Sequence, residues 1–243
     1  MKGFEKFESA IAQAGSKILS PILRSNHAEL EEVIGNHLFD DEGSITLSRQ
    51  PSSDEKFYGM LLSGFSEIAS SYESLQDIEI YVTRFPFSNS RVSKARYLRF
   101  VVEAYLHEVY ILQQRLSSYL KTVQRQYRKH KNSEKIKDIT EGLGNLVTKP
   151  LEGITRVRGT HVHQSRYTNR KLDKLKAIEL VLSIEVDNLL MSFYEIEYRK
   201  TRKEWKTTIK VANENIRDLL DNYFDVLYSV VFTEQGDLQY PNK

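Results

Sequence analysis

The most regular pattern of apolar residues runs from about Arg91 past Tyr127. An apolar side chain stands at every third or fourth position, which is the spacing that lines one face of an α-helix. This spacing predicts a helix of about 35 residues, roughly 50 Å long at a rise of 1.5 Å per residue. Its apolar stripe consists of Leu98, Val101, Val102, Tyr105, Val109, Leu112, Leu116, Leu120, Val123 and Tyr127.

Two further long patterns follow, over residues 169–200 and 204–233. The middle of the first is apolar on nearly all sides, so we expect this helix to run through the core. The second ends in the apolar sequence VLYSVVF. The stripe over 169–200 consists of Leu172, Leu175, Ile178, Leu182, Val186, Leu189, Phe193 and Ile196, thickened by Leu180, Val181, Ile184, Leu190 and Met191.

Shorter helices are predicted nearer the N-terminus. Ser52 and Glu55 have the spacing of a capping box, in which each side chain accepts a backbone hydrogen bond at the start of a helix. The box predicts a helix over 54–70, and a second one is expected over 72–84. Pro21 suits the first turn of a further helix that reaches to about residue 39.

The segment between the long helices is predicted to form two short ones. Ser133 can cap the first, and Gly142 and Gly144 can end it. Thr148 and Pro150 can then begin the second. The residues GSITLS at 43–48 are expected to be a short extended stretch within a loop.

Residues that break helices are few, with five prolines and eleven glycines in 243 residues. We therefore predict an all-α protein, a mainly antiparallel helical bundle with two or three long helices and several short N-terminal helices. The best break is FPFSNS at 85–90. It separates an acidic helical part, residues 1–88, from a basic helical core, residues 89–243, on which the first part is expected to pack.

The net charge of +2 hides a polarised chain. Residues 84–206 carry 26 Lys and Arg against 13 Asp and Glu, whereas the flanks carry 9 against 20. The acidic residues concentrate in 25–48 and 214–237. A basic middle indicates either a polyanion partner or attraction to the acidic segments of the same chain or of another copy.

Several classes of protein are excluded by what the sequence lacks. Without cysteine there is no disulfide, thiol nucleophile, zinc ribbon or iron–sulfur cluster, and a reducing cytoplasmic setting fits best. No uncharged stretch approaches the roughly 18–20 residues of a spanning helix, so no membrane association is expected. The motifs HExxH, GxSxG and the Walker sequence are absent, and we expect neither a metal nor another cofactor.

The segment TRVRGTHVHQSRYTNRK, residues 155–171, concentrates the residues that could carry chemistry. Its cations and imidazoles suit contact with phosphate groups. On a regular helix Arg158 and His163 lie about 140° apart, whereas Arg156 and His163 are nearly eclipsed. Gly159 is unfavourable inside a helix and favours a local end or distortion there. The candidate residues are Arg156, Arg158, His161, His163, Arg166 and Arg170.

The sequence RGTHVH, from Arg158 to His163, resembles the Arg-x4–6-His motif of HEPN-domain proteins. These are small all-α units that often act as metal-independent ribonucleases in toxin–antitoxin and abortive-infection systems. The pairs of Arg156 with His161 and with His163 also have the motif's spacing, and the resemblance covers roughly residues 90–235. The family commonly has a polar residue, often Asn, where this chain has Gly159.

The resemblance implies how these side chains would act. A histidine can accept a proton from a ribose 2′-hydroxyl or return one to the leaving oxygen, and an arginine can stabilise charge on the phosphate. His163 and Arg158 take these catalytic roles, while Arg156, His161, Arg166 and Arg170 would bind the RNA substrate. Two protomers of that family face each other across a shared cleft. Possible supporting residues on the long helix are Glu103, His107 and Tyr110, in a polar stripe that continues to Gln114.

Simpler explanations exist for each of these features. The cluster of Arg and His residues suits hydrogen bonds to loops and carboxylates, and the polar stripe suits a solvated helix face. His161 and His163 could ligate a metal, but they diverge by about 200° on a helix. QRQYRKHK at 124–131 is typical of a basic helix end that either contacts RNA or is merely solvated, and Trp205 is expected to be a packing anchor.

Two functions from different classes remain open on the sequence. The first is a metal-independent endoribonuclease or RNA-binding protein of a bacterial defence or toxin–antitoxin system, with a cognate antitoxin-like protein as a further partner. The second is a catalytically silent helical interaction or scaffold protein. Either way we expect a homodimer, because the apolar stripes exceed what one compact bundle easily covers.

Overall fold

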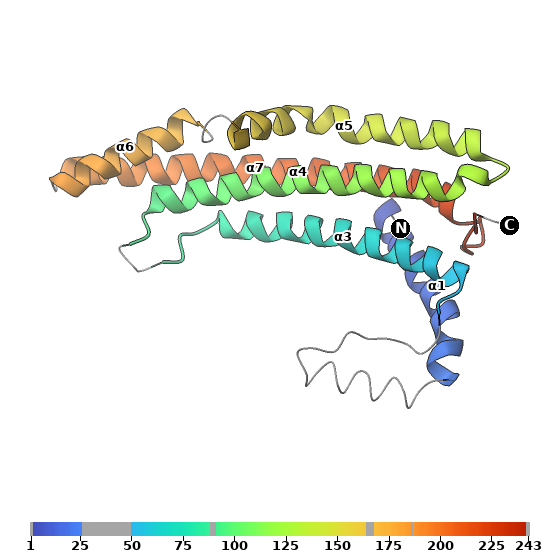
Figure 1. Cartoon of the computed structure of the whole chain (residues 1–243). Coiled ribbons are helices and arrows are strands. Elements are labelled where there is room, and N and C mark those ends of the chain that lie inside the picture. Colours follow the sequence, from blue (N-terminus) through green and yellow to red (C-terminus); the bar gives the residue numbers. More distant parts are fainter. Residues whose placement is uncertain (1, 26–49, 88–90, 164–167, 186, 242–243) are drawn as a thin grey trace. The chain divides into compact units, whose positions relative to one another are not determined.

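Every regular element in the described part of the chain is helical, apart from one isolated bridge between Phe232 and Leu238. In the described residues six α-helices pack as a bundle (Figure 1), so the prediction of an all-α bundle is confirmed. None of the described helices is long and apolar enough to cross a bilayer. The computed structural model describes the chain except residues 1, 26–49, 88–90, 164–167, 186 and 242–243, and gives the backbone alone at 19, 21–25 and 150–163.

The helices vary widely in length, and the longest has 44 residues. A 3₁₀ turn, η1, extends the third of them by one turn, over Tyr127–Lys129. The α-helices are α1 (Gly3–Ser25), α3 (Ser53–Tyr81), α4 (Lys94–Gln126), α5 (Ser133–His163), α6 (Arg170–Ile184) and α7 (Asn188–Val231).

The chain forms two compact units, each assembled from separated stretches. Unit 1 contains residues 1–66, 121–140 and 221–243, and unit 2 contains 67–120 and 141–220. Four helices, α3, α4, α5 and α7, therefore contribute residues to both units. The predicted break at 85–90 separates α3 from α4, and the residues on both sides of it belong to unit 2.

An aromatic cluster forms the core of unit 1. The ring of Phe7 on α1 lies 4.8 Å from that of Phe224 on α7, 5.7 Å from Phe65 on α3 and 5.4 Å from Phe232. Burial of large rings in tilted and edge-on contacts is among the strongest apolar contributions to a core. The first turn of α3 begins with the predicted capping box, because Glu55 N donates to Ser52 Oγ at 3.2 Å and Ser52 N donates to Glu55 Oε2 at 2.9 Å.

Two glycines let α1 approach its neighbours closely. A Cβ atom at Gly3 would lie 2.0 Å from the carbonyl oxygen of Asp221, and one at Gly15 would lie 2.1 Å from the hydroxyl of Tyr58. At Gly3 the close atom belongs to the backbone of α7, so no larger residue fits there without displacing that helix. At Gly15 the close atoms are the end of the Tyr58 side chain, which would have to move.

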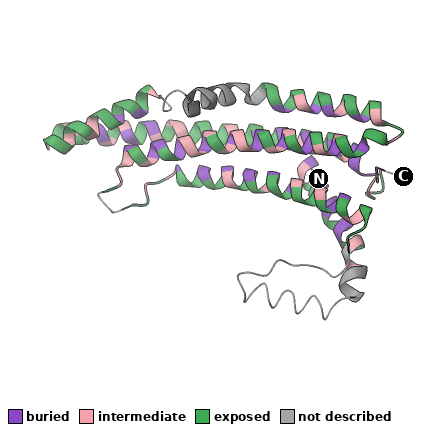
Figure 2. Ribbon diagram, viewed as in Figure 1, coloured by how far each residue is buried: buried purple, intermediate pink, exposed green. Residues whose placement is uncertain are grey.

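The long apolar stripe predicted on α4 is confirmed, because all ten of its residues are buried. Figure 2 shows this burial recurring along one side of α4 and α7. In unit 2 the stripe is joined by one buried amide, Asn213 on α7. Asn213 Oδ1 accepts a hydrogen bond from the Tyr105 hydroxyl at 3.0 Å, and Nδ2 donates to Leu75 O at 3.1 Å and to Glu79 at 2.9 Å. One side chain thus connects α3, α4 and α7.

The carboxylate of Glu179 on α6 connects this helix to two other elements of unit 2. It accepts hydrogen bonds from the backbone N–H of Ala95 at 3.0 Å and from the Ser93 hydroxyl at 2.6 Å, at the start of α4. It also accepts one from the hydroxyl of Tyr194 on α7. A negative charge is favourable at a helix N-terminus, where backbone N–H groups lack partners. This contact fixes α6 against α4 and α7.

Several predicted helix boundaries were wrong. The two helices expected over 54–70 and 72–84 are one helix, α3, because Ser71 is buried inside it and accepts a hydrogen bond from Arg115 instead of capping a new helix. The helix expected to begin at Pro21 begins at Gly3, where the apolar spacing of α1 already starts. The predicted extent of that helix beyond residue 25, and the stretch 43–48, lie outside the described residues.

The two short helices expected after Ser133 form one continuous helix, α5. Gly142 and Gly144 do not end it. A Cβ at either position would meet nothing within 4 Å, so neither glycine is required by a close contact. Their only effect on α5 is the lower helix propensity of glycine. Leu143 and Val147 bury the inner face of α5 across this stretch. The helix also continues through Gly159, where a local end was expected.

The helix predicted over 169–200 is broken in its middle. α6 ends at Ile184, and α7 begins at Asn188 and runs without a break through residues 200–204. Asp187 causes the break, because its Oδ1 accepts hydrogen bonds from Leu189 N at 2.7 Å and Leu190 N at 2.9 Å, as an N-cap does. The expected core position is also wrong, since Ile184 and Leu189 are each 82% exposed.

We predict that Phe7→Ala strongly destabilises the protein. The substitution removes the ring at the centre of the aromatic cluster and leaves a cavity among Phe65, Phe224 and Phe232. The free energy of unfolding, measured by urea denaturation, should fall by about 3–5 kcal/mol. The matched control is Leu62→Ala on α3, whose side chain is partly exposed and which should cost less than about 1 kcal/mol.

We also predict a loss of stability at alkaline pH. Burial raises the pKa of Tyr105 above its usual value of 10.0, and the nearby Glu79 raises it further. The unfolded chain then loses this proton first, so the stabilisation is complete below about pH 10 and is lost as pH rises toward the folded-state pKa. The slope is at most about 1.4 kcal/mol per pH unit for each such tyrosine.

Urea denaturation at about pH 9 and about pH 11 measures this slope. Tyr105→Phe should lower the absolute stability, because Asn213 loses a hydrogen bond, yet reduce the decline between the two pH values. An unchanged decline in the variant would show that Tyr105 does not contribute to it.

Candidate nucleic-acid interface

The predicted catalytic residues lie in the last turns of α5, which ends at His163. The side chains of Arg156, Arg158, His161 and His163 lie outside the described residues, as does the whole of Arg166. The backbone is helical through Gly159, so the angular separation of a regular helix applies to them. Arg156 and His163 therefore share a side of α5 more closely than Arg158 and His163 do.

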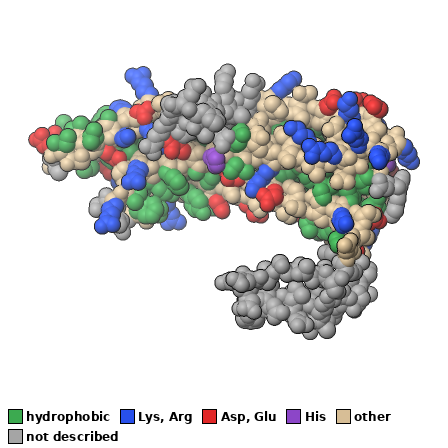
Figure 3. Space-filling view, viewed as in Figure 1, with side chains coloured by type: hydrophobic (Ala, Val, Ile, Leu, Met, Phe, Trp, Pro, Cys, Tyr) green, Lys and Arg blue, Asp and Glu red, His purple; other side chains and the backbone are tan. Residues whose placement is uncertain are grey.

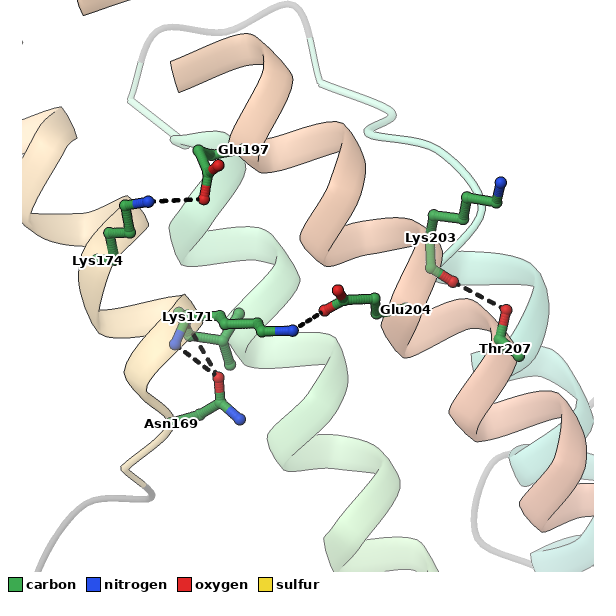
Figure 4. Close-up of polar contacts among 8 residues, drawn as sticks. Asn169, Lys171, Lys174, Glu197, Lys203, Glu204 and Thr207 are labelled. Atoms are coloured by element: carbon green, nitrogen blue, oxygen red, sulfur yellow. Dashed lines mark hydrogen bonds and ion pairs between the residues drawn. The ribbon is translucent and has the colours of Figure 1, made fainter. Parts of the chain in front are cut away.

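Arg170, the last of the predicted binding residues, is exposed at the start of α6. Asn169 caps this helix, its side chain accepting hydrogen bonds from the backbone N–H groups of Lys171 and Leu172 (Figure 4). Arg170 lines a cavity of about 300 Å³ with Lys171, Trp205 and other residues of α6 and α7. Trp205 is half-buried there.

The polar stripe predicted on α4 is only partly exposed. His107 and Gln114 are exposed, whereas Glu103 and Tyr110 are half-buried. The four residues share one side of α4, as the spacing predicts. The imidazoles of α5 lie outside the described residues.

Two of the four basic residues of α6 are paired with carboxylates. Lys171 pairs with Glu204, and Lys174 donates to Glu197 at 2.8 Å, both on α7 (Figure 4). The bond from Lys174 lowers the pKa of Glu197. On the side toward α4, Arg99 is 2.5 Å from Asp173. Asp173, Glu197 and Glu204 all lie within residues 84–206, so these pairs neutralise charge inside the basic middle and do not join it to the acidic segments 25–48 and 214–237.

The acidic residues of the C-terminal segment pair with lysines of α1 and with Lys2, which directly precedes that helix. Lys2 lies 3.5 Å from Asp221, and Lys17 lies 2.5 Å from Asp237. Lys6 is 3.7 Å from Asp225. These three lysines belong to the acidic N-terminal flank and not to the basic middle. The carboxylates with which they pair therefore do not neutralise the positive charge of residues 84–206.

In the turn from α4 through η1 to α5, most cations form no ion pair with a described residue, and the same holds for the exposed cations Arg199, Lys200, Lys203 and Lys206 of α7. We name residues 121–137 the basic turn; it has seven Lys and Arg and one carboxylate, Glu134. Six of the cations are exposed and have no ion pair with any described residue. They are Lys121, Arg125, Arg128, Lys129, Lys131 and Lys135.

Buried side chains hold the basic turn in place from beneath. Val123, Tyr127 and Ile136 are buried in unit 1, and the Tyr127 hydroxyl donates to the carbonyl of Gln239. His130 lies edge-on to the Tyr127 ring, with the ring centroids 5.6 Å apart. Apolar residues thus occupy the inner side and leave the cations facing outward. Figure 3 shows blue side chains gathered where α4 meets α5.

The basic turn also contains a cavity of about 420 Å³. A single carboxylate, that of Glu134, faces three cations there, and Gln124 and Ser133 add neutral hydrogen-bonding groups. This composition suits an anion such as a phosphate group, which cations and neutral donors can contact together. The cationic lining residues are Arg125, Arg128 and Lys137.

Neither metal sites nor known proteins give a further indication of function. The described residues contain no group of three or more His, Asp or Glu side chains that could hold a metal ion. Comparison of the chain with protein-family models, curated proteins and solved structures found no match.

The sequence shows that cations are concentrated in the basic turn, but it does not show whether carboxylates pair with them. Counting charges finds QRQYRKHK as easily as it finds the start of α6. The difference between the two segments is the presence of carboxylates on a neighbouring helix, such as Glu197 and Glu204 beside α6. That difference depends on tertiary structure alone.

Proposed function

We propose that this protein binds RNA through the basic turn. The observation that carries the proposal is that six exposed cations of this segment lack carboxylate partners among the described residues, while the lysines at the start of α6 have them. Unpaired cations on a rigid helical turn attract a polyanion and release its counterions on binding. The cavity beside Arg125 and Arg128 offers room for a phosphate group.

The proposal includes metal-independent cleavage of the bound RNA, in a defence or toxin–antitoxin role. Its support is the resemblance of RGTHVH to the HEPN motif and the position of that motif on α5, the helix that begins within the basic turn. His163 is proposed to transfer the proton between the ribose hydroxyl and the leaving oxygen. Arg158 stabilises the phosphate, and Arg156, His161, Arg166 and Arg170 bind the RNA.

A second candidate function is a catalytically silent interaction protein. The observation that favours it is the large apolar surface that α6 and α7 expose, since extended exposed apolar patches mark interaction sites. The two candidates differ in whether the protein retains RNA at all, and the following measurements separate them.

We predict that RNA affinity falls linearly with the logarithm of salt concentration. Each phosphate contact on a single strand adds about 0.7 to the slope. The triple variant Lys129→Gln, Lys131→Gln, Lys135→Gln should therefore lose about two from the slope, measured by fluorescence anisotropy on a single-stranded RNA. Its unfolding free energy should stay within about 0.5 kcal/mol of the original, because these cations are exposed and form no ion pair with a described residue.

The matched control has the same change in charge on α7. Lys200→Gln, Lys203→Gln, Lys206→Gln replaces three exposed lysines outside the basic turn. An equal loss of slope in both variants would place the contact elsewhere, and a flat salt dependence would favour the interaction protein.

We predict that the purified protein cleaves single-stranded RNA in the presence of EDTA, because proton transfer and charge stabilisation by side chains need no metal. His163→Ala should lower the rate about 10²–10⁴-fold while barely changing RNA affinity. Arg158→Ala should lower both, since its charge also acts on the bound substrate.

His161→Ala serves as the control for cleavage, because its side chain diverges from His163 on a regular helix. Equal losses from both histidines would move the assignment to the Arg156 pairing or to a metal site, and EDTA-sensitive cleavage would select the metal. If the protein and its His163 variant are both inert, the enzyme hypothesis is lost.

A further inference from the structure

A cavity of about 300 Å³ lies between the start of α6 and the middle of α7, within unit 2. Its lining combines an aromatic ring, cations, a carboxylate, a hydroxyl and an amide, and each of these side chains is exposed or half-buried. The cavity is therefore open at the surface of the protein. We name it the Trp205 cavity; it is lined by Asn169, Arg170, Lys171, Glu204, Trp205 and Thr208.

Trp205 stands on the inward side of α7, yet its ring is not fully covered. The residues one turn before and one turn after it on that side, Thr201 and Ile209, are 2% and 0% exposed. Trp205 itself is half-buried and lines the cavity. The buried stripe of α7 is thus interrupted at a large aromatic side chain, and the interruption coincides with the cavity. The indole therefore offers a flat aromatic surface on which a planar ligand can stack.

Arg170 supplies the net charge of the cavity. Its side chain is exposed and forms no ion pair with a described residue. Lys171 and Glu204 pair with each other (Figure 4), so together they add no net charge. The guanidinium of Arg170 leaves the lining with one positive charge, and its planar donors suit a phosphate group.

The two walls of the cavity are held in place by contacts of the protein itself. Asn169 Oδ1 accepts hydrogen bonds from Lys171 N at 3.1 Å and Leu172 N at 3.2 Å, which fixes the first turn of α6. Leu172 is fully buried, and the ion pair of Lys171 with Glu204 joins this turn to α7. These two N–H groups are already bonded, so the contact for an anion is Arg170 and not the helix N-terminus. Walls fixed in this way lower the entropy lost on binding.

We propose that the Trp205 cavity binds one nucleotide of a single-stranded RNA, with the base stacked on Trp205 and a backbone phosphate on Arg170. This inference rests on the proposed function and adds to the basic turn a contact that recognises a base. Aromatic stacking combined with cations along the backbone is how proteins hold single strands. A cavity of about 300 Å³ is at the small end of ligand sites, which suits one nucleotide. Thr208 adds a hydroxyl for the sugar or the base edge.

The composition of the cavity favours a nucleotide over other anionic ligands. A nucleotide in a strand presents one planar base and one negative charge, which match one indole and one unpaired guanidinium. An acidic peptide segment has carboxylates but no planar group for the indole. Residues 163 and 170 are seven positions apart, so their Cα atoms are separated by at most about 25 Å. A short strand that occupies the cavity can therefore also reach the proposed catalytic residues.

The exposed lysines of α7 near Trp205 in sequence do not form part of the cavity. On a regular helix Lys200, Lys203 and Lys206 lie about 140°, 160° and 100° from Trp205. Figure 4 shows the side chain of Lys203 directed away from Lys171 and Glu204. The triple variant of these lysines therefore remains a control for the basic turn.

The experiment uses the fluorescence of Trp205, which is the only tryptophan in the sequence. The full chain is titrated with a short oligouridylate, and tryptophan emission is excited selectively over tyrosine. Stacking of a base on the indole should quench the emission to saturation, with the same midpoint as RNA binding measured by fluorescence anisotropy. Inorganic polyphosphate, a polyanion without bases, is the control and should leave the emission unchanged.

Trp205→Leu separates stacking from packing, because leucine keeps an apolar side chain but has no ring. RNA affinity should fall about 5–150-fold, the range for one stacked base, while the salt slope stays unchanged because stacking releases no counterions. Trp205→Phe keeps a ring and should retain most of the affinity. Thermal melting checks that each variant is folded, and the titration of the unaltered protein tests the proposal even where a variant does not fold.

Arg170→Gln tests the phosphate contact. The salt slope should fall by about 0.7, since one contact to a single strand is lost. The matched control is Lys176→Gln, which removes an exposed cation of the same helix that lines a different cavity and forms no ion pair with a described residue. This variant should leave the slope unchanged.

Three outcomes would overturn the proposal while leaving the basic turn as an RNA site. The first is RNA that binds by anisotropy without quenching Trp205. The second is equal quenching by polyphosphate, because the indole would then respond to charge alone. The third is uridine monophosphate that quenches at a lower concentration than the oligouridylate, which would assign the cavity to a free nucleotide. If no RNA is retained at low salt, the proposed function fails and this inference fails with it.

Discussion

The Glu179 carboxylate determines where α6 lies in unit 2. Only two of the fifteen residues of α6, all of them described, are buried, so the helix has little apolar area with which to hold its place. Instead Glu179 accepts hydrogen bonds from Ser93, Ala95 and Tyr194, which belong to the start of α4 and to α7. With α6 fixed by a polar contact near its end, Ile178 and Leu182 stay half-buried, and three apolar residues remain exposed on the helix. They are Leu180, Val181 and Ile184.

The apolar pattern was sufficient to predict helices that bury one stripe. Every residue of the predicted stripe on α4 is buried, from Leu98 to Tyr127, because helical periodicity and burial coincide there. The prediction of a core helix was wrong over 169–200, where most of the described apolar residues of the middle are exposed. The spacing of apolar residues shows which positions are apolar, but it does not show whether other parts of the protein cover them. The capping hydrogen bonds of Asp187 also interrupt the helix without changing this spacing.

The candidate interface was predictable in part. Sequence alone identifies the cations of 121–137 and those of 170–176, but the two groups differ only after folding, when α7 places Glu197 and Glu204 beside α6. The catalytic hypothesis for Arg158 and His163 depends on the angle between the two residues about the axis of α5. The sequence shows only that they are five residues apart. Because α5 continues through Gly159, this separation corresponds to the angle of a regular helix.

The assembly of unit 1 from three separated stretches affects how the chain folds during synthesis. Its three stretches are separated by long insertions, and its aromatic core needs Phe7 from one end of the sequence and Phe224 from the other. During synthesis this core cannot close until residues beyond 220 have left the ribosome, whereas all parts of unit 2 precede them. Such contacts between distant residues slow folding and leave apolar surface exposed in the meantime. The nascent α1, with its apolar face still uncovered, is therefore the segment that most needs protection by chaperones.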